Sequence, residues 1–153
     1  MNKTNRVLLI EKDELLADIT ALRLELLGFK VHCAQSIAAA CVQVANEPRF
    51  ALLLIDLDME GDKSEGLSMI QKSVAAATGT PSPVLVLTGD VESVRQEIIA
   101  RSGTEKCDFL PLPYNPFLLE QKISQLLGRP VPSAVRARNS ESTGITENEA
   151  IAT

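Results

Sequence analysis

The sequence has few aromatic side chains and only one histidine. Its 153 residues contain no Trp, one Tyr and four Phe. Such a scarcity of rings argues against a surface that stacks nucleic-acid bases. The formal net charge of −5 argues against a protein that binds phosphate backbones. We therefore expect no nucleic-acid partner.

Paired cysteines and long apolar runs are also lacking. Cys33, Cys41 and Cys107 show no C-x-x-C spacing, and their odd number is typical of reduced thiols. No apolar run approaches the roughly 20 residues of a membrane span. The apolar run near the N-terminus, residues 7–10, is too short for a signal peptide. These observations predict a cytoplasmic protein that does not contact a membrane.

What the sequence does contain, over residues 1–128, is an alternation of short apolar strands with longer helical patterns. The predicted strands are residues 7–10, 30–34, 51–55, 84–87 and 107–112, each followed by a predicted helix. Five such repeats imply an α/β fold, a parallel sheet with helices on both faces. The strand at 51–55 is apolar throughout, which suits a central position. Lys30 and Pro111 place the second and fifth strands at the edges.

The helical patterns predict both helix starts and a core-facing surface. Asp13, Ser36 and Asn115 are predicted N-caps. The first helix carries an apolar stripe with spacing i, i+4, i+7, i+11, which predicts a face against the core. The members of this stripe are Leu15, Ile19, Leu22 and Leu26.

Beyond the last predicted helix the composition changes. Residues 129–153 contain no Leu, Phe, Tyr or Trp and are rich in Pro, Ser, Ala, Asn and Thr. Such a segment buries too little apolar surface to fold by itself. We predict one domain at 1–128 followed by a disordered C-terminal tail.

Polar side chains gather where the predicted strands end. Residues 11–13 (Glu-Lys-Asp), 56–58 (Asp-Leu-Asp) and 88–90 (Thr-Gly-Asp) each follow a strand. The carboxyl ends of parallel strands are where such sheets bind ligands. Two carboxylates about 4 Å apart repel by roughly 4 kcal/mol at an effective dielectric of 20, so a cation must offset them. The sequence offers Lys12 for this purpose, or a divalent metal.

With these motifs in place, the sequence resembles the receiver domain of two-component response regulators, the CheY-like superfamily, over about residues 5–128. The resemblance rests on residues 7–16, 54–57, 84–89 and 108–116. It implies a doubly wound (βα)5, flavodoxin-like sandwich with the strand order 2-1-3-4-5.

The resemblance also implies roles for individual residues. Asp56 falls at the phosphoacceptor position, and Thr88 and Phe109 fall at the two switch positions. The acidic pocket comprises Glu11, Lys12 and Asp58. Glu11, Asp56 and the main-chain carbonyl of Asp58 would be the ligands of Mg²⁺. A cis bond between Leu112 and Pro113 is a further feature that the family often has.

Three departures from the family pattern affect this chemistry. Lys12 stands in place of the second acid, Leu112 in place of the lysine after the fifth strand, and Glu60 in place of a proline. Phosphoryl transfer needs positive charge around the phosphoryl oxygens. Without that lysine, and with Lys12 at a metal-ligand position, we expect weak Mg²⁺ binding or none. Lys12 is predicted to replace the ion by pairing with Asp56 or Glu11.

Our first hypothesis is therefore a degenerate receiver, a stand-alone signalling protein of a phosphorelay that is not an enzyme. It would act through protein contacts, with Asp56 phosphorylated weakly or not at all. Its partners would be a histidine kinase, a phosphotransfer protein or a downstream regulator. We expect a monomer or a weak dimer through the fourth helix, fifth strand and fifth helix.

Two alternatives stay open. The first is a functional single-domain response regulator, phosphorylated on Asp56 by a histidine kinase, with Lys12 reaching the phosphate. The second is a phosphatase of the haloacid dehalogenase type, since residues 56–58 and 87–89 resemble its first two motifs. The position of the first motif on the third strand argues against that second alternative.

Overall fold

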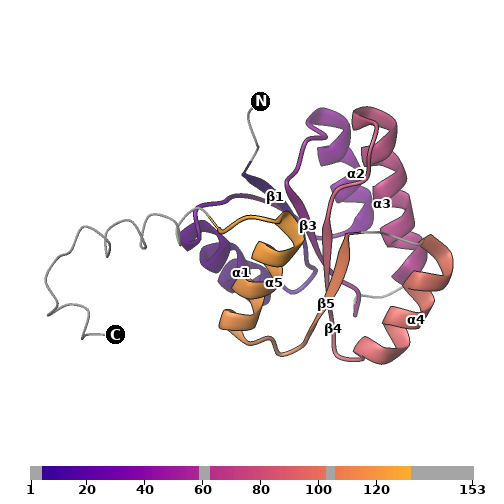
Figure 1. The fold of residues 1–153 in the computed structure, drawn as a ribbon. Coiled ribbons are helices and arrows are strands. Elements are labelled where there is room, and N and C mark those ends of the chain that lie inside the picture. Colours follow the sequence, from indigo (N-terminus) through magenta and orange to yellow (C-terminus); the bar gives the residue numbers. More distant parts are fainter. Residues whose placement is uncertain (1–4, 59–62, 103–105, 132–153) are drawn as a thin grey trace, which may run out of the picture.

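A computed structural model describes residues 5–58, 63–102 and 106–131 (Figure 1). Glu60 and residues 132–153 of the predicted tail lie outside the described residues. The strands are β1 (Arg6–Ile10), β2 (Lys30–Ala34), β3 (Leu52–Asp56), β4 (Val84–Thr88) and β5 (Cys107–Pro111). The helices are α1 (Glu14–Leu26), α2 (Ile37–Asn46), α3 (Lys63–Thr78), α4 (Val91–Ser102) and α5 (Pro116–Leu127).

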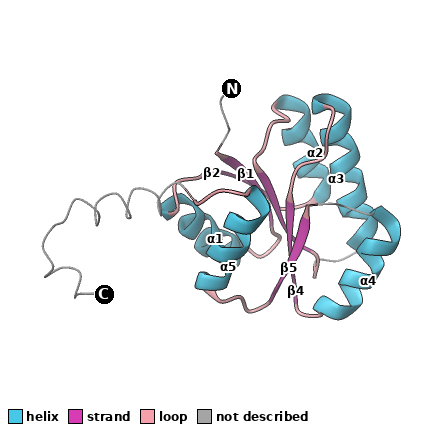
Figure 2. Cartoon of the chain, in the orientation of Figure 1, coloured by secondary structure: helices cyan, strands magenta, loops and turns pink. Residues whose placement is uncertain are grey.

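The strands form one parallel sheet with the order β2-β1-β3-β4-β5, as predicted. Figure 2 shows the strands in magenta between two groups of helices. Every residue of β3 and β4 is buried, in keeping with the apolar sequences of these strands. β2 and β5 form the edges, where Lys30 and Pro111 are exposed. The sheet therefore brings the ends of β1, β3 and β4 next to one another at its centre.

Helices cover both faces of the sheet (Figure 1). On one face α1 and α5 pack on alternate residues of the central strands, among them Leu9, Leu54 and Leu85. On the other face α2, α3 and α4 pack on the intervening residues, such as Leu8 and Ile55. Within the described ranges, none of the helices has the length and apolar character needed to cross a membrane.

The helix starts follow the predicted capping chemistry. The side chain of Asp13 accepts a hydrogen bond from the amide of Leu16, and Ser36 caps α2 in the same way. Asn115 accepts from the first amides of α5, and Gly128 ends that helix in the left-handed conformation. α3 begins at Lys63, three residues before the predicted start at Gly66.

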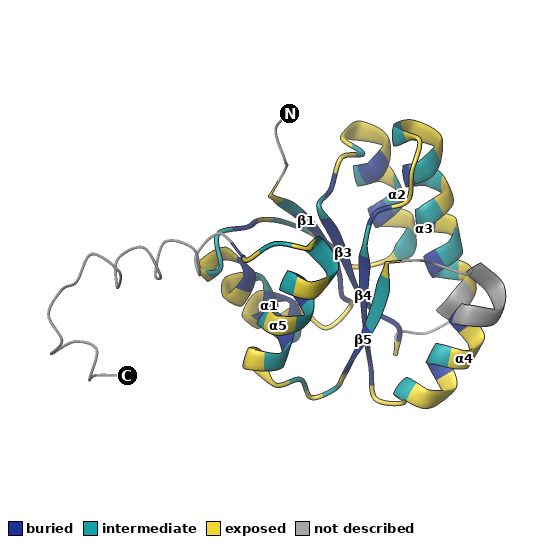
Figure 3. Ribbon diagram, viewed as in Figure 1, coloured by how far each residue is buried: buried dark blue, intermediate teal, exposed yellow. Residues whose placement is uncertain are grey.

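The prediction for the core-facing side of α1 is wrong. Leu15, Ile19, Leu22 and Leu26, which we call the α1 stripe, are exposed. The buried residues of α1 are instead Ala17, Thr20 and Leu24, on the opposite side of the helix. Figure 3 colours parts of α1 as exposed and parts as buried. The small side chains at 17 and 20 fit against the sheet, and the Thr20 hydroxyl pairs with the Tyr114 hydroxyl at 2.8 Å. α1 is thus apolar on two sides, with Leu24 directed inward and the α1 stripe outward.

This orientation predicts unequal costs for two leucine truncations in one helix. Leu24→Ala removes a fully buried side chain, so we expect the free energy of unfolding to fall by about 2–5 kcal/mol. Leu22→Ala removes an exposed side chain and should change it by less than about 0.5 kcal/mol. Urea denaturation of both variants measures the difference, and equal losses would contradict the orientation of α1.

Candidate active-site cleft

Three polar residues that the sequence placed at strand ends are buried together at the carboxyl edge of the sheet. Glu11 follows β1, Asp56 ends β3 and Thr88 ends β4, and their exposed fractions are 2%, 7% and 0%. β1 and β4 both pair with β3, so Asp56 lies between the other two. Burial of two carboxyl groups side by side is costly unless charge is removed or balanced.

Glu11 shows how part of this cost is avoided. Its Oε2 accepts a hydrogen bond from the amide of Asp13 at 3.1 Å. Burial, reinforced by the neighbouring Asp56 carboxyl, raises the pKa of Glu11 to about 8. This shift favours the protonated form of Glu11. Its other oxygen, Oε1, is buried and has no partner among the described atoms unless that proton is shared with Asp56.

Lys12 is the next residue of the chain after Glu11. Glu11 is buried, whereas Lys12 is exposed. The raised pKa of Glu11 reduces the negative charge that Lys12 was expected to balance. The replacement of a metal ion by Lys12 stays a prediction.

Asp58 has a role that the sequence analysis missed. Its carboxylate accepts hydrogen bonds from the Thr88 hydroxyl and the Gly89 amide, both at 2.8 Å. The amide of Asp58 donates to Oδ1 of Asp56 at 2.8 Å. A Cβ atom at Gly89 would lie 3.2 Å from Asp58 Oδ2, so glycine allows this close approach. The side chain of Asp58 thereby links the end of β3 to the end of β4.

The hydrogen bond from the Thr88 hydroxyl to Asp58 predicts that its removal lowers the free energy of unfolding. Thr88→Val keeps the side-chain shape but removes the buried hydroxyl, which also accepts from the Asp90 amide. Because Asp58 is exposed and can turn to water, we expect a loss of about 1–2 kcal/mol of unfolding free energy. Thr88→Ser, which keeps the hydroxyl, is the matched control. Equal losses in urea for the two variants would assign the effect to packing.

Phe109, at the second predicted switch position, points into the core. It is buried against the face covered by α2, α3 and α4. The guanidinium of Arg95 on α4 lies 4.7 Å from the centre of its ring, a cation–π contact. The next residue toward the N-terminus, Asp108, forms an ion pair with Lys122 at 3.1 Å. The contact between Arg95 and Phe109 could not be predicted from the sequence, since it depends on how α4 packs.

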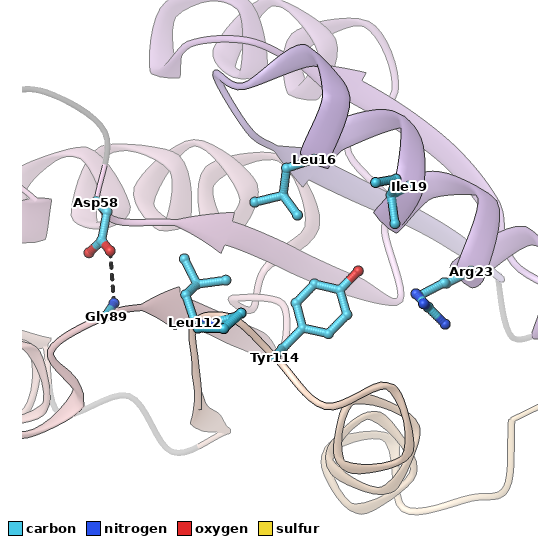
Figure 4. A pocket seen from close by; sticks show the side chains of 8 residues that line it. Leu16, Ile19, Arg23, Asp58, Gly89, Leu112 and Tyr114 are labelled. Carbon is cyan, nitrogen blue, oxygen red and sulfur yellow. Dashed lines mark hydrogen bonds between the residues drawn. The ribbon is translucent and has the colours of Figure 1, made fainter.

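An open groove of about 470 Å³ begins beside Asp58 and runs between α1 and the segment after β5 (Figure 4). Its walls are largely apolar and include Leu16, Leu112 and Tyr114, with Arg23 at the α1 side. Leu112 also packs against the core beneath α1 and α5, and the Leu112–Pro113 peptide is cis. At the position where the resemblance calls for a lysine, the structure thus presents an aliphatic side chain.

The donor set for a metal ion fits Mg²⁺ only in part. The orphaned Glu11 oxygen and the Asp56 carboxyl supply two oxygen ligands in a buried place. The carboxylate of Asp58 is directed to Thr88 and Gly89 instead. Over residues 5–58, 63–102 and 106–131, no group of three or more His, Cys, Asp or Glu side chains is arranged to hold a metal. A cation here would have to displace the Glu11 proton.

The comparisons with known proteins agree with this architecture. No family model matches the sequence, and no curated protein matches it either. Among solved structures, the chain has the fold of receiver domains. The similarity covers most of the chain at low sequence identity, so it defines the fold.

Three of these structures illustrate the match. The chemotaxis protein CheY4 of Vibrio cholerae has a TM-score of 0.69 and 18% identity, covering 81% of this chain and 99% of its own. A response regulator receiver protein of Pseudomonas putida has a TM-score of 0.67 and 20% identity, with coverages of 82% and 99%. The receiver domain of the sensor histidine kinase PA1611 of Pseudomonas aeruginosa has a TM-score of 0.65 and 19% identity, with coverages of 82% and 98%. That structure holds magnesium in its active-site cleft.

Proposed function

We propose that this chain is a cytoplasmic signalling domain of the two-component type that acts through protein contacts and accepts phosphate on Asp56 poorly or not at all. The receiver fold and the position of Asp56 at the end of the central strand support the signalling class. The buried Glu11–Asp56 pair, without a lysine at Leu112, carries the proposal of weak phosphorylation.

The charge balance around Asp56 disfavours a phosphoryl group. Phosphorylation adds about −1.5 to −2 charges next to Glu11 and two residues from Asp58. Leu112 can donate no hydrogen bond to the new oxygens and supplies no positive charge. Mg²⁺ would be held by Glu11 and Asp56 and would supply that charge, but it must compete with the Glu11 proton and with Lys12 nearby. We therefore propose weak Mg²⁺ binding at most.

The protein partners of such a domain would be a histidine kinase, a phosphotransfer protein or a downstream regulator. The Glu11–Asp56 pair would then have a structural role at the carboxyl end of the sheet. Signalling would occur through contacts between the surface of the domain and its partners. In this proposal the domain turns over no substrate, and a generic phosphate ester should not be hydrolysed.

Incubation with acetyl phosphate and Mg²⁺, followed by intact mass spectrometry, tests the proposal. In a productive reaction a carboxylate oxygen of Asp56 attacks phosphorus, the bond to acetate breaks, and acetate leaves. We expect little or no added phosphate in the wild type, and the same result for Asp56→Asn. Rapid, Mg²⁺-dependent addition of one phosphate that Asp56→Asn abolishes would overturn the proposal.

That contrary result would favour a working response regulator instead. One observation supports this second candidate. Asp56 retains a 7% exposed fraction and stands beside Thr88, the predicted switch hydroxyl. Replacing Lys12 by Asp would then impair phosphorylation, since Lys12 would be the group that reaches the phosphate.

A further inference from the structure

The outer side of α1 carries the main apolar patch on the described surface. The four side chains of the α1 stripe, Leu15, Ile19, Leu22 and Leu26, have exposed fractions between 43% and 70%. The other exposed large apolar residues of the described ranges are single ones on other helices: Val42, Met69 and Phe117. α4, in contrast, exposes Glu92, Ser93, Gln96 and Glu97. A continuous apolar stripe of this kind is typical of an interaction surface.

The spacing of the stripe fits a second helix. Its residues follow one another at intervals of four, three and four, which is the spacing of the d and a positions in a coiled coil. At about 100° per residue they fall within an arc of about 60°. Leu24 and Ala17 on the opposite side hold α1 to the sheet. The stripe therefore points away from the core, accessible to a partner helix.

The charges beside the stripe indicate which partner helix, and in which orientation, would fit it. With Ile19 at an a position, Asp18 and Glu25 occupy g positions and Arg23 an e position, and all three are exposed. In a parallel pair, a g residue of one helix faces an e residue of the other, five positions further on. Asp18 of each copy would then face Arg23 of the other. An antiparallel pair would bring Asp18 against Glu25, two like charges.

We propose that the α1 stripe is a self-association surface on which two copies of this chain pair through parallel α1 helices. The pairing is isologous, so each copy contributes the same apolar seam and both Asp18–Arg23 pairs form. One helix of 13 residues offers less area than a standard interface, so we expect the association to be weak and reversible. The proposal does not depend on the chemistry of Asp56.

Pairing through α1 also affects the groove. Ile19 and Arg23 belong to the self-association surface and line the groove that begins beside Asp58. A second copy on α1 would therefore occupy one side of that groove, so that the dimer and a partner bound there exclude each other.

Sedimentation velocity of the full chain over a wide concentration range, in reducing buffer because Cys33 is exposed, tests the proposal. We expect a reversible monomer–dimer equilibrium in the wild type. Leu22→Glu puts a charge in the seam and should weaken the association at least about tenfold. Val42→Glu makes the same change at an exposed site on α2 and should have no effect. Circular dichroism confirms that both variants are folded.

Charge exchange tests the orientation. Asp18→Arg and Arg23→Asp should each weaken the dimer, since each places like charges face to face in a parallel pair. The double variant restores opposite charges and should recover most of the wild-type association. A wild type that stays monomeric at all concentrations would overturn the proposal and leave the stripe to a different partner. An unaffected Leu22→Glu dimer would also overturn it, as would a dimer that Asp18→Arg strengthens, the result expected of antiparallel helices.

Discussion

The double variant Lys12→Asp/Leu112→Lys is expected to take up phosphate from acetyl phosphate at Asp56 about 10 to 1000 times faster than the wild type. It restores an acidic ligand for Mg²⁺ and a cation for the phosphoryl oxygens, the two groups that the departures remove. A pair of unit charges about 4 Å apart interacts by roughly 4 kcal/mol at an effective dielectric of 20, and each 1.4 kcal/mol changes a rate about tenfold.

Both substitutions suit their positions. Lys12 is exposed, so an aspartate there remains in contact with water. Leu112 is half-buried along the groove, where the aliphatic stem of a lysine can replace it while the ammonium reaches the opening. Intact mass spectrometry over time, with and without Mg²⁺, gives the rates.

Two controls isolate the cause of the gain. Lys30→Asp/Val42→Lys places the same two charges at exposed sites of β2 and α2 and should leave the rate unchanged. Asp56→Asn added to the first double variant should abolish the modification. If the double variant folds and remains unmodified, missing charge is not what limits phosphorylation in this chain.

A second large effect is expected in the pH dependence of stability. The pKa of Glu11 is about 8 in the folded protein and 4.5 without its surroundings. Between these values the folded state binds a proton that the unfolded state has released, so the free energy of unfolding falls as pH rises. The contribution of Glu11 is complete below pH 4.5 and lost above about pH 8. Its size is at most on the order of a few kcal/mol, at about 1.4 kcal/mol per unit of pKa.

Urea denaturation at several pH values from 5 to 9 measures this slope. Glu11→Gln keeps the shape of the side chain and cannot ionise, so its stability should vary much less over the same range. Asp18→Asn removes a carboxylate from the exposed side of α1 and should keep the wild-type slope. If Glu11→Gln shows the wild-type slope as well, Glu11 does not keep its proton in the folded state.

The fold could be predicted from the sequence because its signals are local. The apolar run at 51–55 defined a central strand, and Pro111 placed β5 at an edge; the sheet order confirms both. The buried side of α1 could not be predicted, since both sides of that helix are apolar. The choice depends on how Ala17, Thr20 and Leu24 pack together against the sheet.

For the cleft, strand ends predicted which residues meet, and the structure brings Glu11, Asp56 and Thr88 together. The carboxylate of Asp58 was missed, because its bonds to Thr88 and Gly89 depend on the orientation of a loop. The proton on Glu11 was missed as well. A prediction from sequence assigns each ionisable side chain its ordinary pKa. Burial shifts the pKa and can thereby change the charge of the side chain.

At the junction of β1 and α1, Glu11 accepts from the amide of Asp13, which in turn caps α1. The residue that titrates in the cleft and the residue that begins the outer helix are thus joined by one hydrogen bond. Linkage between two equilibria is reciprocal. If deprotonation of Glu11 alters the position of α1, occupation of the outer side of α1 must shift the titration of Glu11 to a corresponding extent. The protonation state of Glu11 would then depend on whether a partner occupies the outer side of α1.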